Sequence, residues 1–508
     1  MIPQWTIFET EFTTSVTYAN PFWDVTLEAH FTGPSGEQQT ITAFWDGGDA
    51  WRLRFSPTAV GIWQWQTICS DVSNSGLHGQ SGTLECVAYT GDNPLYKHGA
   101  LRLSTNQRYI EHADGTPFFW LADTPWNGVL ISKADDWEYF LTKREEQGFT
   151  AMQFVTTQWR GYHPGLPDAY TGTERITLNP ELFQRQDERI TALNAHGMIA
   201  AAVNLWTLTA TDPGQTLSEA DAIRLVQYQI ARWGAHQVVW LLGGDGCYER
   251  SGLIDRFKQI GRAAFGERHD RLVTLHPCGV YWTGETFRDE DWFDFVGYQS
   301  GHGSSDEHIR WLVDGPPAHD WSNEPVLPVI NLEPNYEGHP SYHIQQNFTD
   351  YHVRRASYWS LLVSPTAGVT YGSNEIWLWA DEAMPAPNHA NIGVVQPWHM
   401  GVETPGLTGM RILKQFFDSI RWTELEPSQG LIAQQPGDAD PNRFITAAQT
   451  PDGGQAVIYL PVGGTVTLTR SGGQARWFNP RTGDWSAAAG SDTFTAPDEQ
   501  DWVLVISA

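Results

Sequence analysis

The sequence contains few cysteines, and this shortage excludes a class of small disulfide-rich proteins. The four cysteines in 508 residues are Cys69, Cys86, Cys247 and Cys278. They are too few for a disulfide scaffold in a chain of this length, and no CxxC pair suggests a zinc site. We therefore expect free thiols, as in a reducing cell, although Cys69 and Cys86 fall in one predicted β-domain and could meet.

Basic residues are also scarce. Lys and Arg number 31 against 59 Asp and Glu, which gives a formal net charge of −28. Binding to nucleic acid or to an anionic membrane surface needs clustered positive charge, so we expect neither partner. The same charge makes a strongly anionic polymer a less natural substrate unless a local basic pocket overrides it.

Long apolar runs and targeting segments are missing too. No run approaches the ~20 residues that span a bilayer. The first residues, MIPQWTIFETEFTT, show neither a basic region nor an apolar one. We expect a cytoplasmic protein, or a secreted one if a leader was removed. No motif calls for a cofactor or a metal, and the sequence leaves open whether the chain forms a homo-oligomer.

Aromatic residues, by contrast, are abundant, at 13% of the chain with 25 tryptophans. Well-filled cores of aromatic-rich β-domains account for part of this. The other explanation is sugar binding, because the apolar C–H faces of sugar rings pack on indole rings while their hydroxyls take hydrogen bonds.

The two ends of the chain read as all-β. In residues 1–92, Val25, Leu27, Ala29 and Phe31 alternate with polar residues, and Gly/Pro/Asp turns separate short strands, which predicts an immunoglobulin-like β-sandwich. Residues 420–508 repeat this pattern on a smaller scale and predict a second β-sandwich.

The middle of the chain, residues 93–419, alternates strands with helices. The apolar runs lack alternation, as in parallel strands that are buried on both faces. Ser218 can cap a helix that Gly234 ends. Eight units of this kind predict a (β/α)8 TIM barrel, an α/β fold. The eight predicted strands are Phe118–Asp123, Ala151–Thr157, Ile199–Asn204, Val238–Leu242, Leu272–His276, Phe293–Tyr298, Val326–Leu332 and Gly368–Tyr371.

In such a barrel the active site is built at the C-terminal ends of the strands. Nearly every predicted strand delivers an acid, amide, histidine or aromatic residue there. Two of these acids, Asp245 after the fourth strand and Glu333 after the seventh, can face each other across the mouth. Glycosidic cleavage needs two carboxyl groups, one as general acid and one as nucleophile or base. We therefore interpret Asp245 and Glu333 as the catalytic pair.

Alternatives exist for both acids. Gly243-Gly-Asp245-Gly also describes a turn or a helix cap, although the glycines would let the backbone approach a ligand and leave the aspartate unshielded. Glu337 competes with Glu333 four residues on, but Pro334 disfavours helical geometry at Glu333 and keeps it at the strand end.

The other strand-end residues are candidates for binding substrate. Asp123 would bind hydroxyls deep in the pocket, or cap the following helix. His302, Asp306 and His308 could form a metal site, which no further feature supports. The predicted substrate-binding residues are Asp123, Trp126, Trp159, Asn204, His276, Gln299, His302, Tyr336, Glu337, Tyr371 and Trp377.

The strand-end motifs together resemble those of the apiosidase-like glycoside hydrolases over about 300 residues. The flanking domains resemble the β-sandwich often fused before such barrels and the small collagen-binding-like domain that often follows them. The motifs are Asp123-Thr-Pro-Trp126, Trp240-Leu-Leu-Gly-Gly-Asp245, Tyr298-Gln-Ser-Gly-His302, Glu333-Pro-Asn-Tyr-Glu337 and Gly368-Val-Thr-Tyr-Gly372.

This resemblance implies a retaining hydrolase with Asp245 as acid/base and Glu333 as nucleophile. Its best-known members remove apiose, a branched furanose, from plant glycans, so we expect an exo-acting enzyme of carbohydrate metabolism that cleaves a terminal furanoside from a plant or microbial glycoside. The segment from Leu378 to Leu407 would roof the pocket and set specificity. The alternatives are a pyranosidase of the same mechanism and a non-catalytic carbohydrate-binding protein.

Overall fold

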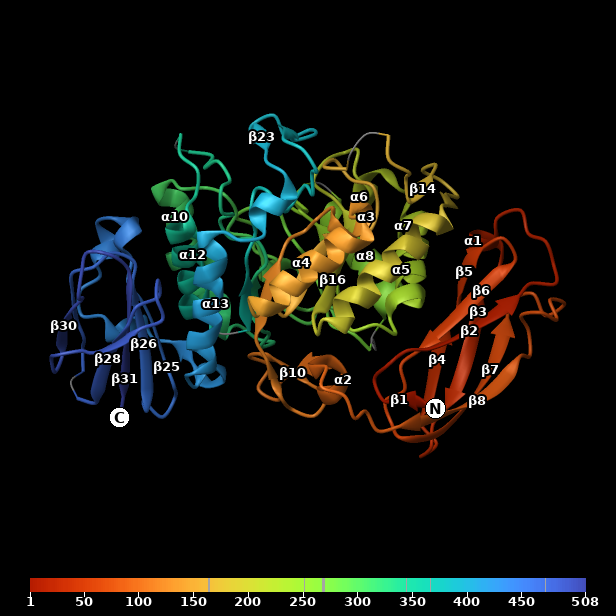
Figure 1. Ribbon diagram of the computed structural model, residues 1–508, viewed down its shortest axis with the longest axis horizontal. Coiled ribbons are helices and arrows are strands. Elements are labelled where there is room, and N and C mark those ends of the chain that lie inside the picture. The colour runs from red at the N-terminus through yellow and green to blue at the C-terminus, as the bar shows by residue number, and fades with distance from the viewer. Residues whose placement is uncertain (163–164, 251, 267–269, 344, 366, 471) are drawn as a thin grey trace.

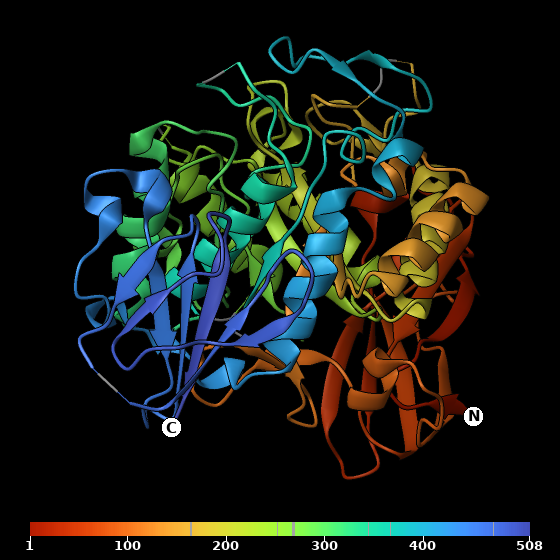
Figure 2. The ribbon, with the colours of Figure 1, turned by 60° about the vertical axis from the view of Figure 1, so that its left-hand side comes forward.

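The computed structural model describes residues 1–162, 165–250, 252–266, 270–343, 345–365, 367–470 and 472–508. A central α/β barrel lies between two β-sandwiches, the N-terminal one at the right of Figure 1 and the C-terminal one at the left, and Figure 2 shows the same arrangement from a second direction. No described helix is long and apolar enough to cross a membrane.

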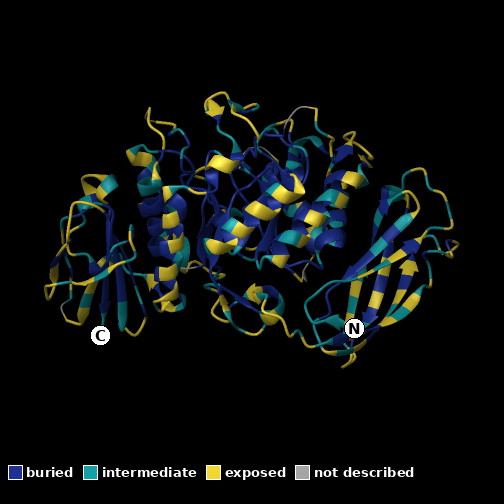
Figure 3. Ribbon diagram, viewed as in Figure 1, coloured by how far each residue is buried: buried dark blue, intermediate teal, exposed yellow. Residues whose placement is uncertain are grey.

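The barrel sheet contains eight parallel strands, each of which overlaps a run predicted from the sequence, and β16 and β17 extend two residues beyond their predicted ends. The non-alternating runs are buried along their whole length, which is why they are apolar on both faces; Figure 3 shows this dark blue centre. The strands are β12 (Trp120–Asp123), β13 (Ala151–Val155), β16 (Ile199–Trp206), β17 (Val238–Gly244), β18 (Val273–Thr274), β19 (Val296–Tyr298), β20 (Val329–Asn331) and β21 (Gly368–Thr370).

The strand order is β18-β17-β16-β13-β12-β21-β20-β19, so β18 and β19 end the ladder. Hydrogen bonds across this seam bring the two together. The Thr274 hydroxyl donates to the Phe295 carbonyl and accepts the Gly297 N–H, and the Asp294 N–H donates to the Val273 carbonyl. The predicted TIM barrel is confirmed.

Helices follow the strands. Ser218 caps α7 by accepting the Asp221 N–H, and Gly234 ends that helix, as predicted. Between β18 and β19 the only helix among the described residues is the single turn α9. The helices are α3 (Gly128–Ile131), α4 (Ala134–Glu146), α5 (Pro180–Ala195), α6 (Pro213–Thr216), α7 (Glu219–Trp233), α8 (Leu253–Phe265), α9 (Gly284–Phe287), α10 (Asp306–Asp314), α11 (Pro316–His319), α12 (Asp350–Val363) and α13 (Pro405–Asp418).

The N-terminal domain has two sheets whose alternating residues enclose a separate core. Between this domain and the barrel come α2 (Pro94–His98) and the small sheet of β9 (Leu101–Leu103), β10 (Ile110–His112) and β11 (Pro117–Phe118), which lies below the barrel in Figure 1. The two sheets are β1 (Ile2–Pro3), β8 (Ser81–Val87), β7 (Gly61–Cys69), β3 (Leu27–Thr32) and β4 (Gln38–Thr42), and β2 (Phe8–Thr13), β6 (Ala50–Phe55) and β5 (Phe44–Gly47).

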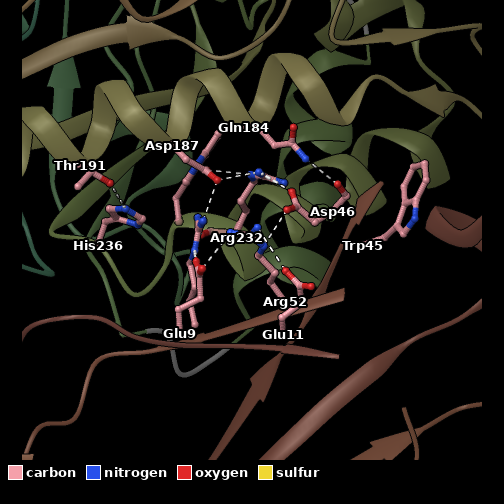
Figure 4. A network of polar contacts seen from close by, with 12 residues as sticks. Glu9, Glu11, Trp45, Asp46, Arg52, Gln184, Asp187, Thr191, Arg232 and His236 are labelled. Carbon is pink, nitrogen blue, oxygen red and sulfur yellow. Dashed lines mark hydrogen bonds and ion pairs between the residues drawn. The ribbon is translucent and has the colours of Figure 1, made fainter. Parts of the chain in front are cut away.

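An ionic network joins the N-terminal domain to the barrel (Figure 4). Asp187 on α5 accepts from Arg232 on α7 and from Arg54 on β6, with Nη2–Oδ2 distances of 2.7 Å in both cases. Arg232 also lies 2.8 Å from Asp46 of the N-terminal domain. The two arginines depress the pKa of Asp187 to about 2 against the opposing effect of its burial. Each buried charge therefore has an opposite charge beside it, as buried ions require.

The C-terminal sandwich docks on α12. Arg354 donates twice to the buried Asp501, at 2.7 and 3.0 Å, and the rings of Tyr358 and Tyr459 stack with their centroids 4.8 Å apart. The sandwich consists of β24 (Glu426–Pro427), β25 (Thr446–Gln449), β26 (Gln455–Leu460), β31 (Trp502–Ser507), β28 (Gln474–Phe478) and β29 (Trp485–Ala487), with β27 (Thr465–Thr467) and β30 (Thr493–Thr495) as the second sheet.

The prediction of free thiols is wrong for two of the four cysteines. Cys247 and Cys278 form a disulfide, whereas Cys69 and Cys86 are free and buried in the N-terminal domain. The two bonded residues are 31 positions apart, and only the barrel topology brings their loops together.

Candidate active site

A cavity of about 440 Å³ opens where the barrel strands end. Asp245 and Glu333 both line it. Aromatic residues that strand-end position had selected form much of its wall, with Trp126, Trp159, Tyr336 and Trp377 all among them. Gln299 and His302 complete the set of predicted residues that reach the cavity.

The segment that follows β21 lies over this cavity. It carries the short hairpin β22 (Met384–Pro385) and β23 (Val394–Val395), which stands above the barrel in Figure 1. His389 and Ile392, between the two hairpin strands, line the cavity. The hairpin segment thus supplies part of the cavity wall from above.

Asp245 follows β17 in an unusual backbone conformation. Its φ is +50°, in the left-handed region that residues with a side chain seldom adopt. The preceding glycines have a packing reason: a Cβ at Gly243 would lie 2.2 Å from the Tyr248 hydroxyl, and one at Gly244 would lie 2.5 Å from the Trp206 ring. The glycines therefore make room for aromatic neighbours, not for a ligand as the sequence had suggested.

The Asp245 carboxylate has few protein partners. Arg160 lies 3.8 Å from it, and within the described parts of the chain it makes no side-chain hydrogen bond. Burial and then the charge of Glu333 raise the pKa of Asp245 to about 6, while Arg160 and two histidines act in the opposite direction. An aspartate with this pKa can hold a proton in weakly acidic solution, as a general acid must.

Glu333, just after β20, is held quite differently. His302 Nε2 donates to Oε1 at 2.9 Å, and His276 Nε2 lies 3.2 Å from Oε2. Burial favours the neutral acid, but these two histidines outweigh it and lower the pKa of Glu333 well below its ordinary value. Glu333 is therefore ionised where Asp245 is protonated.

His276 contacts both acids. Its Nδ1 accepts the backbone N–H of Asp245 at 3.3 Å, which leaves the proton on Nε2, the atom that faces Glu333. The side chain is fully buried and is not part of the cavity wall. His276 was predicted to bind substrate; the structure places it behind the two acids instead.

Four more predicted substrate-binding residues do not reach the cavity. Asp123 forms a fully buried ion pair with Arg144 at 2.6 Å, so the prediction that it binds substrate hydroxyls is wrong. Glu337 accepts from Tyr371, Thr404 and the Gly406 N–H, which uses both its oxygens. Tyr371, which donates to Glu337, and Asn204, which donates to Gln229, are both fully buried, so neither lines the cavity as predicted.

Other cavity residues were not predicted, among them Arg160, His339, Tyr342 and His389. Arg160 directly follows Trp159, so the strand-end rule could have found it. The others come from loops whose path the sequence did not indicate. His308, considered as a metal ligand, contacts the Ser300 carbonyl and the Gly303 N–H, and the described residues contain no group of three His, Cys, Asp or Glu side chains that could hold a metal.

Several buried polar atoms at the cavity have no hydrogen-bond partner among the described residues. They are Arg160 Nε, Trp206 Nε1, Gln299 Oε1 and His302 Nδ1. Unsatisfied buried polar groups are rare in folded proteins, and all four of these atoms belong to residues of the cavity wall. A larger hollow of about 650 Å³ between the N-terminal domain and the barrel contains neither Asp245 nor Glu333.

Comparisons with known proteins identify the domains of the chain. The family model of the apiosidase-like catalytic domain matches residues 104–424. A domain of unknown function matches residues 1–70, and a domain named for collagen binding in a collagenase matches residues 427–507. No curated protein matches this chain.

Solved structures resemble the whole arrangement. A family 5 glycoside hydrolase from Bacteroides vulgatus superposes with a TM-score of 0.72 at 22% identity, covering 82% of this chain and 95% of its own. A second glycoside hydrolase structure from the same organism gives 0.73 at 17% identity and covers 100% of this chain and 99% of its own. These identities establish the fold alone. The family match spans most of the chain and includes both cavity carboxylates, so the chain belongs to the apiosidase-like family and is a glycoside hydrolase.

Proposed function

We propose that the protein is a retaining, exo-acting glycoside hydrolase with Asp245 as acid/base and Glu333 as nucleophile. One observation carries the proposal. Two carboxylates face one cavity, and their surroundings shift the two pKa values in opposite directions. Such a separation supports Asp245 as the proton donor and Glu333 as the ionised partner, and the family match favours a nucleophile over a general base for Glu333.

The reaction takes two steps. Glu333 attacks the anomeric carbon while Asp245 transfers its proton to the glycosidic oxygen, so the bond to the leaving group breaks as a glycosyl ester forms. Asp245, now ionised, then takes a proton from water, and the resulting oxygen nucleophile displaces Glu333. The two histidines that stabilise the Glu333 carboxylate also stabilise it as the leaving group of the second step.

The size and cover of the cavity support action on a terminal sugar. About 440 Å³ lies toward the small end of the usual range for ligand pockets. His389 and Ile392 of the hairpin segment line it from above, which favours a chain end over an internal stretch of polysaccharide. The family name indicates apiose, a furanose, as the first sugar to test.

A panel of aryl furanosides and pyranosides, including the apioside, tests the proposal against wild type and the Asp245→Asn and Glu333→Gln variants. We expect wild type to release the aryl alcohol from a furanoside, and proton NMR of the first product to show the substrate's anomeric configuration. Turnover of pyranosides alone would reassign the sugar, and an inverted first product would overturn retention. Wild-type rates in either variant would refute the carboxylate assignment, and binding with no turnover of any glycoside would indicate a carbohydrate-binding protein.

A further inference from the structure

The disulfide lies close in sequence to Asp245, one of the proposed catalytic acids, and to His276, which contacts both acids. Cys247 comes two positions after Asp245, and Cys278 comes two positions after His276. Both cysteines line the cavity, and their Cα atoms are 5.1 Å apart. The bond therefore joins the loop after β17 to the loop after β18 at the rim of the site.

The two loops continue the barrel ladder beyond the ends of their strands. The His276 N–H donates to Gly243, the Gly246 N–H donates to His276, and the Cys278 N–H donates to Gly246, with distances of 2.9, 3.1 and 3.0 Å. Gly246 and Pro277 form a parallel bridge. The disulfide closes this extension one residue further out.

Asp245 depends on that extension for its position. Its carboxylate makes no hydrogen bond to any residue that the structure describes, and Arg160 approaches it only to 3.8 Å, so the direction of the side chain depends mainly on the backbone. The backbone is in the left-handed conformation, with φ +50°, and its N–H is held by His276 Nδ1. A loop free to relax would turn this residue toward a commoner conformation and move the carboxyl group.

We propose that the Cys247–Cys278 disulfide is a positioning element that holds Asp245 where it can protonate the leaving group. The inference rests on the proposed function. The bond ties the acid-bearing loop to the loop of His276, whose other nitrogen faces Glu333. The bond thereby keeps the proton donor correctly placed relative to the nucleophile and takes no part in the reaction itself.

The test uses the Cys247→Ser/Cys278→Ser double variant and two glycosides of the sugar that wild type cleaves. One has a 2,4-dinitrophenyl leaving group, which departs without a proton, and the other has a phenyl group, which needs one. We expect kcat for the phenyl glycoside to fall on the order of 10- to 100-fold, the effect of a displacement of about 1 Å, with KM nearly unchanged. For the dinitrophenyl glycoside, kcat/KM, which reports the first step, should be largely retained.

A second readout is the pH profile. Burial is the largest cause of the raised pKa of Asp245. A loosened loop admits water, so the alkaline limb of kcat/KM should move to lower pH. The matched control is Cys69→Ala/Cys86→Ala, which removes the two free thiols of the N-terminal domain and should leave both readouts unchanged.

The same measurements can be made on wild type after reduction with tris(2-carboxyethyl)phosphine, with the free thiols counted by alkylation. This experiment needs no substitution, so it still tests the proposal if the double variant does not fold. Equal losses on the two leaving groups, or no loss on either, would overturn the positioning role. If instead the loss of activity in Asp245→Asn did not depend on the leaving group, the proposed function would fail. Failure of the proposed function can therefore be distinguished from failure of the positioning role.

Discussion

Four of the acids at the strand ends of the barrel divide into two pairs. Asp245 and Glu333 reach the cavity, whereas Asp123 and Glu337, near β12 and β21, face into protein. In this second pair, here called the inner pair, Asp123 is bound by Arg144, and Glu337 accepts hydrogen bonds from a hydroxyl group and a backbone amide. The difference teaches that strand-end position selects candidates, and that access to the cavity then distinguishes the chemical pair from the structural pair.

The largest effect should come from removing the ionised member of the cavity pair. Glu333→Ala should lower kcat on the order of 10⁴-fold or more, since no other group there can form the covalent intermediate. Added azide should restore turnover of an activated glycoside and give a glycosyl azide of inverted configuration, seen by NMR. Glu337→Ala is the control: if azide rescued that variant instead, the division into pairs would be reversed.

Removing the protonated member should have a smaller effect that depends on the substrate. Asp245→Asn should cost about 10²- to 10⁴-fold in kcat with a poor leaving group, the range of general acid catalysis. The loss in the first step should shrink as the leaving group improves, and steady-state kinetics with a series of aryl glycosides measures this slope. A loss independent of the leaving group would contradict the role of proton donor.

The inner pair should affect stability before it affects chemistry. Asp123→Asn leaves the Arg144 charge buried without its partner, and breaking such a pair costs about 3–5 kcal/mol. Urea denaturation should show a midpoint lowered accordingly, while the protein that remains folded keeps most of its kcat. A stable Asp123→Asn protein without activity would move Asp123 into the catalytic group.

The smallest effect should be a shift in pH dependence. Asp245 must be protonated, so activity is present below its pKa of about 6 and declines as pH rises through that value. Arg160 lowers this pKa, so Arg160→Gln should raise it and move the alkaline limb of kcat/KM upward. At the optimum the rate should change roughly fivefold or less, the worth of a partly exposed ion pair. A downward shift would show that Arg160 does not act on Asp245 through its charge.

The barrel could be predicted from the sequence because its signals are local. Runs such as Ile199–Trp206 are apolar without alternation, and one capping serine with one glycine defined α7. The strand-end rule then selected eight residues that do line the cavity, since all parallel strands of a barrel end at the same rim.

The partners of those residues could not be predicted, because they are distant in sequence. Glu337 accepts a hydrogen bond from Thr404, 67 positions away, and this contact occupies a carboxylate oxygen that a catalytic acid would need for the substrate. The contact of Arg160 with Asp245 and the pairing of Cys247 with Cys278 depend in the same way on how neighbouring strands are placed. Which hydrogen-bond and ionic partners a side chain finds depends on the assembled fold, and no local sequence pattern encodes them.

The Asp187 carboxylate, which joins the N-terminal domain to the barrel, limits how the two domains can be recombined in evolution or in protein engineering. Asp187 is shared between Arg232 of its own barrel and Arg54 of the preceding domain. A barrel separated from residues 1–92 would lose Arg54 and, with Asp46, the second partner of Arg232. The domain therefore cannot be exchanged as an independent module: a chimaera, natural or designed, must carry the matching charges of α5 and α7 along with the sandwich.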